Sequence, residues 1–129
     1  IADIRPAERT TAAGRFVTVP GHDTKGHRVV WIDYAAGLSM HTVVTDVPAE
    51  RRLQRMASAD PAEHRISYGC VNLPARFFED VAAPAFAKGR GVIYILPDTR
   101  RLEDVFPGLA GSTVARRPAA ALLARATDR

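Results

Sequence analysis

The sequence predicts a single, mainly β domain with two or three short helices. Its 129 residues, 47% of them hydrophobic, are enough to bury one core. Runs rich in Val, Ile, Thr and aromatic residues, bounded by Gly, Pro or Asp, favour strands. Four segments fit that description: Gly14–Pro20, Arg28–Tyr34, Leu38–Val44 and Gly91–Leu96.

Each predicted strand has its own features. The polar stretch Gly21–Gly26 joins the first two strands as a hairpin-like connection. In the third strand, alternation places Met40 and Thr42 on one face and His41 on the other. The fourth strand is continuously apolar between Gly91 and Pro97, which predicts a buried, central strand.

Two helices and a tail complete the prediction. Pro48–Ala59 has helical apolar spacing, and Pro74–Ala83 predicts a second helix with Pro84 as its end. Residues 1–110 are expected to form the domain, and the Ala- and Arg-rich residues 111–129 either a docked terminal helix or a frayed tail. The first helix would bury Ala49, Leu53 and Met56, and the second would bury Phe77, Phe78 and Val81.

The composition of the chain limits the kinds of function and partner that we expect. No run of eighteen apolar residues occurs, so no transmembrane helix is expected. Eighteen Lys and Arg against 14 Asp and Glu give a net charge of +4, which favours polyanionic surroundings such as nucleic acid, anionic lipid or a bacterial wall. The single cysteine, Cys70, excludes an internal disulfide and a Cys-rich zinc site.

Cys70 lies in the most informative segment, Ile66–Pro74 (ISYGCVNLP), after a glycine and before a predicted helix. In such a turn, backbone amides converge and the thiol is exposed, which suits a nucleophile. A lone cysteine is also often a small buried hydrophobic residue. The segment by itself leaves both interpretations open.

Ser67-Tyr68-Gly69-Cys70-Val71-Asn72 resembles the cysteine motif of the L,D-transpeptidases, the YkuD-like enzymes of bacterial cell walls. That motif is Ser or Thr, His, Gly, Cys, an apolar residue, then Arg or Asn. Further segments occur in the family's order and extend the resemblance over about Thr10–Pro97. Thr10–Phe16 resembles the family's Thr-Pro-x-Gly-x-Phe segment. Met40-His41 resembles the end of the strand that carries the family's histidine, and Gly89–Leu96 resembles the family's closing strand.

The sequence departs from the family at three points. Tyr68 stands where the family usually has His, so the role of that imidazole does not carry over. The stretch between His41 and Ser67 is longer than usual. The family's first strands, normally upstream of the Thr-Pro-x-Gly segment, are expected to be removed or trimmed here.

The resemblance implies an L,D-transpeptidase-like β-sandwich or barrel-like fold and a cysteine acyltransferase. Cys70 would attack a peptidoglycan stem peptide at an L,D-bond, form a thioester and pass the acyl group to an amine, by cross-linking or D-amino-acid exchange. His41 would be the base, and Thr42, or a main-chain carbonyl near it, would orient the imidazole. The oxyanion hole would come from the loop Ser67, Tyr68, Gly69 and the Cys70 amide.

The same resemblance implies a periplasmic or envelope location, no cofactor, no metal and sensitivity to carbapenems; it leaves the oligomeric state open. Asn72 would hold the loop or a substrate carboxylate, or else cap the following helix. We expect residues 45–65 to form a helical flap over the site. Its Arg51, Arg52 and Arg55 would meet substrate carboxylates or form an ordinary solvated face.

Other functions remain as alternatives. The same thioester gives an L,D-carboxypeptidase, an endopeptidase or a wall-targeting toxin. A basic module that binds nucleic acid or wall polymer is disfavoured because its arginines are scattered without interleaved aromatics. His22, His27 and His64 read as solvated loop residues, and a zinc site from His22, His27 and His41 matches no ligand spacing.

Overall fold

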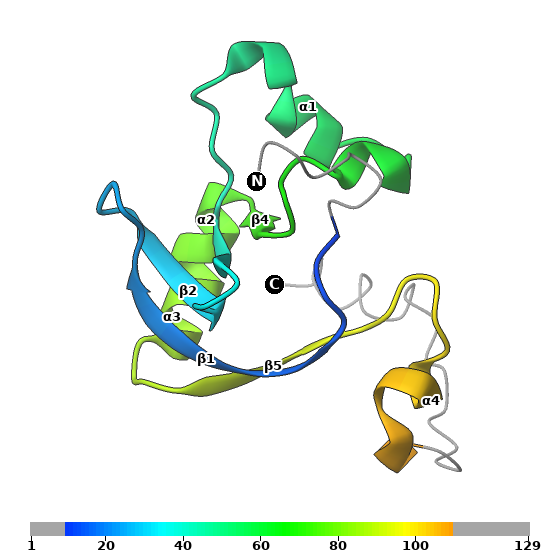
Figure 1. The fold of residues 1–129 in the computed structure, drawn as a ribbon. Coiled ribbons are helices and arrows are strands. Elements are labelled where there is room, and N and C mark those ends of the chain that lie inside the picture. The colour runs from blue at the N-terminus through cyan, green and yellow to red at the C-terminus, as the bar shows by residue number, and fades with distance from the viewer. Residues whose placement is uncertain (1–9, 110–129) are drawn as a thin grey trace, which may run out of the picture.

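The computed structural model describes residues 10–109, in which one five-stranded sheet curls into a half-barrel (Figure 1). The strand order is β4-β3-β2-β1-β5, and every neighbouring pair is antiparallel except β3 and β4, which run parallel. The strands are β1 (Gly14–His22), β2 (Arg28–Asp33), β3 (Leu38–Thr42), β4 (Val71–Leu73) and β5 (Gly91–Ile95).

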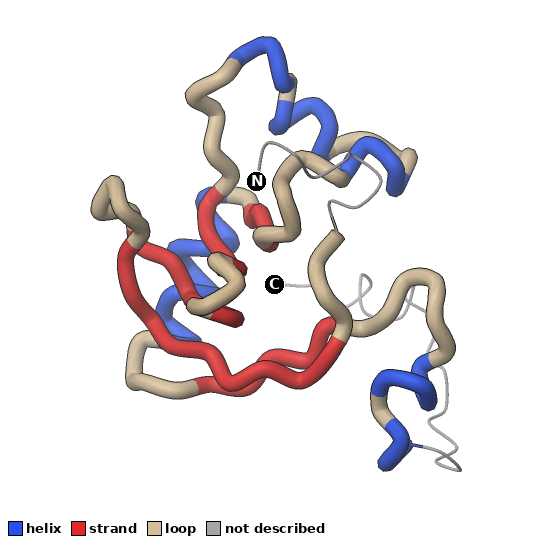
Figure 2. Tube along the Cα trace, viewed as in Figure 1, coloured by secondary structure: helices blue, strands red, loops and turns tan. Residues whose placement is uncertain are grey.

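The mainly β prediction holds only in part. Of the described residues, 28% lie in strands and 31% in helical segments, so the domain is a mixed one organised by its sheet. Figure 2 shows the strands as one curled band, and within residues 10–109 no second sheet packs against it. The curl follows from β1, which pairs with β5 over Gly14–Thr18 and then with β2 over Val19–His22.

Helical turns separate β3 from β4 and β4 from β5. The predicted helix over 48–59 is broken, because Arg51 takes a left-handed conformation (φ 48°) between two short turns. The first group is η2 (Pro48–Glu50), α1 (Arg52–Met56) and η3 (Pro61–His64). The second is α2 (Ala75–Phe77), the π-helical η4 (Phe78–Ala82) and α3 (Ala83–Phe86), and after β5 come α4 (Leu102–Val105) and η5 (Pro107–Leu109).

The predicted end of the second helix at Pro84 is wrong. The Ala83 N–H bonds to the carbonyl of Phe78, five residues back, which widens the turn before the proline. Pro84 then falls in the first turn of α3, where its missing N–H costs little, and the helix continues to Phe86.

The core lies between the sheet and the α2–α3 helix. Phe78, 1% exposed, packs with Val30, Ile32, Met40 and Ala82. The predicted burial of Phe77 and Val81 is wrong, since both are about half exposed, at 49% and 50%. The face that meets the sheet is instead formed by Phe78, Ala82 and Phe86, spaced by four residues.

The prediction of a central β5 is also wrong. β5 pairs with β1 on one side only and is an edge strand, so its residues alternate between the core and solvent. Ile93 and Ile95 pack against the core, while Val92 and Tyr94 are exposed. No helix in residues 10–109 is long and apolar enough to cross a bilayer. The tail predicted over 111–129 lies outside the described residues.

Candidate active site

The parallel pairing of β3 with β4 brings Cys70 to His41. In that register Met40 is opposite Val71 and His41 is opposite Asn72, so Cys70, one residue before β4, lies beside Ser39. Met40 packs into the core, and alternation turns Ser39 and His41 to the other face. Three polar side chains therefore meet on the face of the sheet opposite the core.

The Cys70 thiol is half-buried and has polar neighbours on several sides. Its Sγ lies 3.7 Å from the Ser39 Oγ and 3.6 Å from the Gly37 carbonyl oxygen. A side-chain hydrogen bond with His41 lowers the pKa of the Cys70 thiol and raises the pKa of the His41 imidazole. Both directions favour the thiolate–imidazolium pair.

The orientation of His41 is set by its neighbour in β3. The Nδ1 atom lies 2.7 Å from the carbonyl oxygen of Thr42. A carbonyl only accepts, so Nδ1 carries the proton and Nε2 is left for the thiol. Thr42 thus acts on the imidazole through its main chain, one of the two possibilities that the sequence left open.

The Ser67–Cys70 loop is closed by its own side chains and by the N-terminal segment. Ser67 Oγ donates to the Cys70 carbonyl (2.6 Å) and accepts from the Gly69 N–H (3.3 Å). Gly69 has φ 125°, and a Cβ there would lie 3.0 Å from the Thr10 carbonyl oxygen. Thr11 Oγ1 donates to the Gly69 carbonyl at 2.7 Å. These contacts require glycine at this position.

Asn72 also supports the loop, because its Nδ2 donates to the Cys70 carbonyl at 3.1 Å. The helix that follows Pro74 has no side-chain cap, so the capping role considered for Asn72 is not observed. Tyr68, which replaces the family's usual His, is about half exposed beside the thiol.

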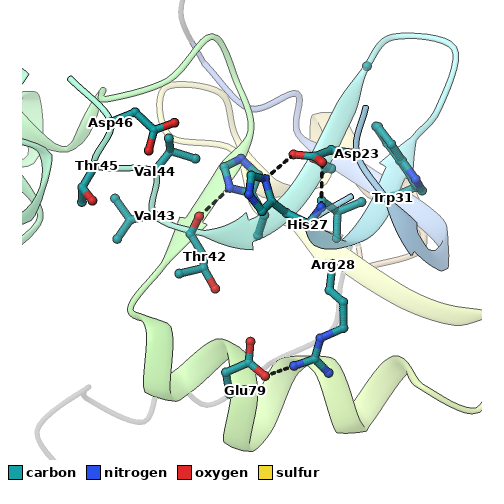
Figure 3. Close-up of a pocket in the computed structure, with 14 residues that line it drawn as sticks. Asp23, His27, Arg28, Trp31, Thr42, Val43, Val44, Thr45, Asp46 and Glu79 are labelled. Atoms are coloured by element: carbon teal, nitrogen blue, oxygen red, sulfur yellow. Dashed lines mark hydrogen bonds and ion pairs between the residues drawn. The ribbon is translucent and has the colours of Figure 1, made fainter. Parts of the chain in front are cut away.

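Within the described part of the chain, three cavities adjoin the Cys70–His41 pair. The Tyr68 cavity, about 300 Å³, includes both Cys70 and His41 in its lining. The Met56 cavity, about 280 Å³, lies against Cys70. The His27 cavity, about 530 Å³, lies against His41 and is drawn in Figure 3. The Cys70 thiol and the His41 imidazole therefore each border two of these cavities.

The three flap arginines differ in their surroundings. Arg52, 18% exposed, lines the Tyr68 cavity and pairs with Glu50 at 2.5 Å. Arg55 forms hydrogen bonds within the flap, since it donates to the carbonyls of Glu63 and Arg65, each at 3.0 Å. Arg51 lies in the left-handed turn and lines a separate hollow under Val47 and Leu53.

The flap packs less closely on the domain than its apolar spacing predicts. Leu53 is 60% exposed, and α1 contains no buried residue. Met56 instead lines the cavity next to Cys70, together with His64. Figure 1 shows the segment standing apart from the sheet and the α2–α3 helix. A helix this short cannot bury a whole apolar stripe.

Neither the role of Ser39 nor the pairing of Asp23 with His27 was predicted from the sequence. Ser39 precedes His41 by two residues in a strand, and that spacing alone places both on one face. Asp23 and His27 flank the β1–β2 turn, where His27 Nδ1 lies 3.0 Å from Asp23 Oδ2. Among the described residues, no three His, Cys, Asp or Glu side chains gather closely enough to hold a metal ion.

Comparison of the chain with protein-family models, curated proteins and solved structures found no match.

Proposed function

We propose that the protein is a cysteine acyltransferase that forms a thioester with a peptidoglycan stem peptide at an L,D-bond and transfers it to an amine. The observation that carries this proposal is the Cys70–His41 pair, held by the β3–β4 register and oriented by the Thr42 carbonyl. The peptidoglycan substrate and an envelope location rest on the resemblance of residues 67–72 to the L,D-transpeptidase motif.

The first half-reaction follows from this geometry. His41 Nε2 takes the thiol proton, and the thiolate of Cys70 attacks the carbonyl carbon of the L-residue. As the C–N bond breaks, the imidazolium returns the proton to the leaving amine of the D-residue, and a thioester remains. The Thr42 carbonyl and the Ser39 hydroxyl stabilise the charged pair through hydrogen bonds to the imidazolium and the thiolate, respectively.

We propose that the Ser67–Cys70 loop binds the oxyanion of the tetrahedral intermediate. The N–H of Gly69 now makes a long hydrogen bond to Ser67 Oγ, at 3.3 Å. A developing negative charge is a better acceptor than a hydroxyl, so the oxyanion would compete for this donor.

The surroundings of Cys70 support an enzyme rather than a binding module with a structural cysteine. A structural cysteine is typically inert and buried in the core. Cys70 is outside the buried cluster, adjoins two cavities and has its pKa lowered by an imidazole. Hydrolysis of the same thioester, which would make the protein an L,D-carboxypeptidase or endopeptidase, uses the same residues.

Mass spectrometry of the protein after incubation with a carbapenem tests the proposal. We expect a covalent adduct on Cys70 and none on the Cys70→Ser variant. Incubation with purified muropeptides should then release the terminal D-residue, and the products would distinguish transfer from hydrolysis. An unmodified Cys70 together with unchanged muropeptides would contradict the proposal.

A further inference from the structure

A second carboxylate–imidazole pair lies in the turn between β1 and β2. Asp23 Oδ1 accepts from the backbone N–H groups of Lys25 and His27, each at 2.8 Å, and Oδ2 lies 3.0 Å from His27 Nδ1. Although slight burial acts to raise it, hydrogen bonds from His27 and Lys25 lower the pKa of Asp23. A fixed carboxylate only accepts, so Nδ1 of His27 carries the proton and Nε2 is the free acceptor.

This pair shares a cavity with the catalytic base. Asp23, His27 and His41 all line the His27 cavity, and Figure 3 shows Asp23 and His27 joined at its edge. The cavity also reaches Gly37 and Ser39, whose oxygens lie 3.6 and 3.7 Å from the Cys70 Sγ. A molecule bound there would lie against His27 and also against His41, whose imidazole hydrogen bonds to Cys70.

The other charged groups of the cavity already have partners. Arg28 pairs with Glu79, and Asp46 pairs with Lys25 at 3.4 Å. His27 Nε2 has no hydrogen-bond partner within residues 10–109. Because Glu79 and Asp46 are paired with cations, His27 Nε2, which Asp23 orients, is an open acceptor among the described residues of this cavity.

We propose, building on the acyltransferase function, that the His27 cavity binds the acyl acceptor, a primary amine, and that the Asp23-oriented His27 accepts a proton from it. The chemistry needs a second proton acceptor. An amine is an ammonium ion at neutral pH, and it must lose two protons to become an amide nitrogen in the product.

The protons and bonds balance over the two bases. The ammonium gives its first proton to His27 Nε2, and the resulting amine attacks the thioester carbonyl carbon. The tetrahedral intermediate gives its second proton to His41 Nε2. The C–S bond then breaks, the amide bond is complete, and Cys70 leaves as a thiolate beside the protonated His41.

The test measures the two half-reactions separately. The acyl-enzyme is formed with a stem tetrapeptide, and the ratio of amine transfer to hydrolysis is followed by mass spectrometry. One arm supplies a free D-amino acid and the other a stem peptide with a free side-chain amine, because both sources have a primary amine. In His27→Gln we expect the ratio of transfer to hydrolysis to fall about tenfold or more. In Asp23→Asn we expect the same ratio to fall as well.

His22→Gln is the matched control, since the exposed His22 ends β1 and lines none of the three cavities described above. Its transfer ratio should match that of the unsubstituted protein. An unchanged ratio in His27→Gln, with its folding checked by circular dichroism, would overturn the inference. An equal loss in His22→Gln would do the same. If the unsubstituted protein forms no acyl-enzyme, the proposed function itself fails.

Discussion

Two segments that border the Cys70–His41 site, the β3–β4 region and the flap, are built in different ways. The β3–β4 region places the thiol and the base by strand register, over a core in which Met40 packs with Phe78. The flap over residues 45–65 reaches the same site with Arg52 and Met56 but buries no residue in its helical turns. The chemistry is therefore expected to depend on the sheet, and substrate recognition on the flap.

Truncation of one apolar side chain in each region should give the largest difference between the regions in the free energy of unfolding. Phe78→Ala removes a fully buried ring and is expected to cost about 3–5 kcal/mol of the free energy of unfolding. Leu53→Ala, in the exposed flap, should change it by roughly 0.5 kcal/mol or less. Urea denaturation measures both, and similar losses would show that the flap is part of the core.

Gly69→Ala should distort the loop that carries Cys70. Its φ of 125° is unfavourable for alanine, and the new Cβ would lie 3.0 Å from the Thr10 carbonyl. We expect a loss of about 1–3 kcal/mol in stability and slower carbapenem acylation. Gly26→Ala is the control, since it has φ 85° with no atom within 4 Å. Equal acylation rates in the two variants would contradict a special role for this loop.

Arg52→Gln should weaken binding of an anionic muropeptide and raise its KM about threefold to tenfold, because Arg52 alone of the three flap arginines lines the cavity with Cys70 and His41. Arg51→Gln is the matched control and should change KM little. Steady-state turnover gives both values. A larger effect at Arg51 would mean that substrate approaches along the outer side of the flap.

Ser39→Ala removes one hydrogen bond to the thiolate, so the pKa of Cys70 should rise by a smaller amount than on loss of His41. Alkylation by iodoacetamide at pH 7 is expected to slow about twofold to fivefold. The same substitution at Ser67, whose hydroxyl contacts the Cys70 carbonyl rather than the sulfur, should alter loop stability more than the pH profile.

The sequence allowed β1, β2 and β3 to be predicted because they depend on local signals, whereas the thiol–imidazole pair was predicted from the family resemblance. Residue composition, alternation and turn residues located these strands, and the resemblance of Met40-His41 to the family's histidine strand pointed to His41. The order of strands is a long-range property, so the apolar run Gly91–Leu96 predicts a buried strand but cannot specify that this strand lies at the edge of the sheet.

The remaining differences have local physical causes. The π-turn before Pro84 depends on backbone hydrogen bonds that residue types do not specify. The approach of the β1–β2 turn to His41 depends on the curl of the sheet, so Asp23 and His27 read as ordinary loop residues in the sequence.

The rate of Cys70 alkylation by iodoacetamide between pH 5 and pH 10 tests the central pairing most directly. The hydrogen bond with His41 lowers the pKa of the thiol, so the reactive thiolate should persist at pH values well below the free-thiol pKa of about 8.5. In His41→Ala the inflection should move up to or above that value. Profiles that coincide for the two proteins would show that His41 does not activate Cys70 and would contradict the account.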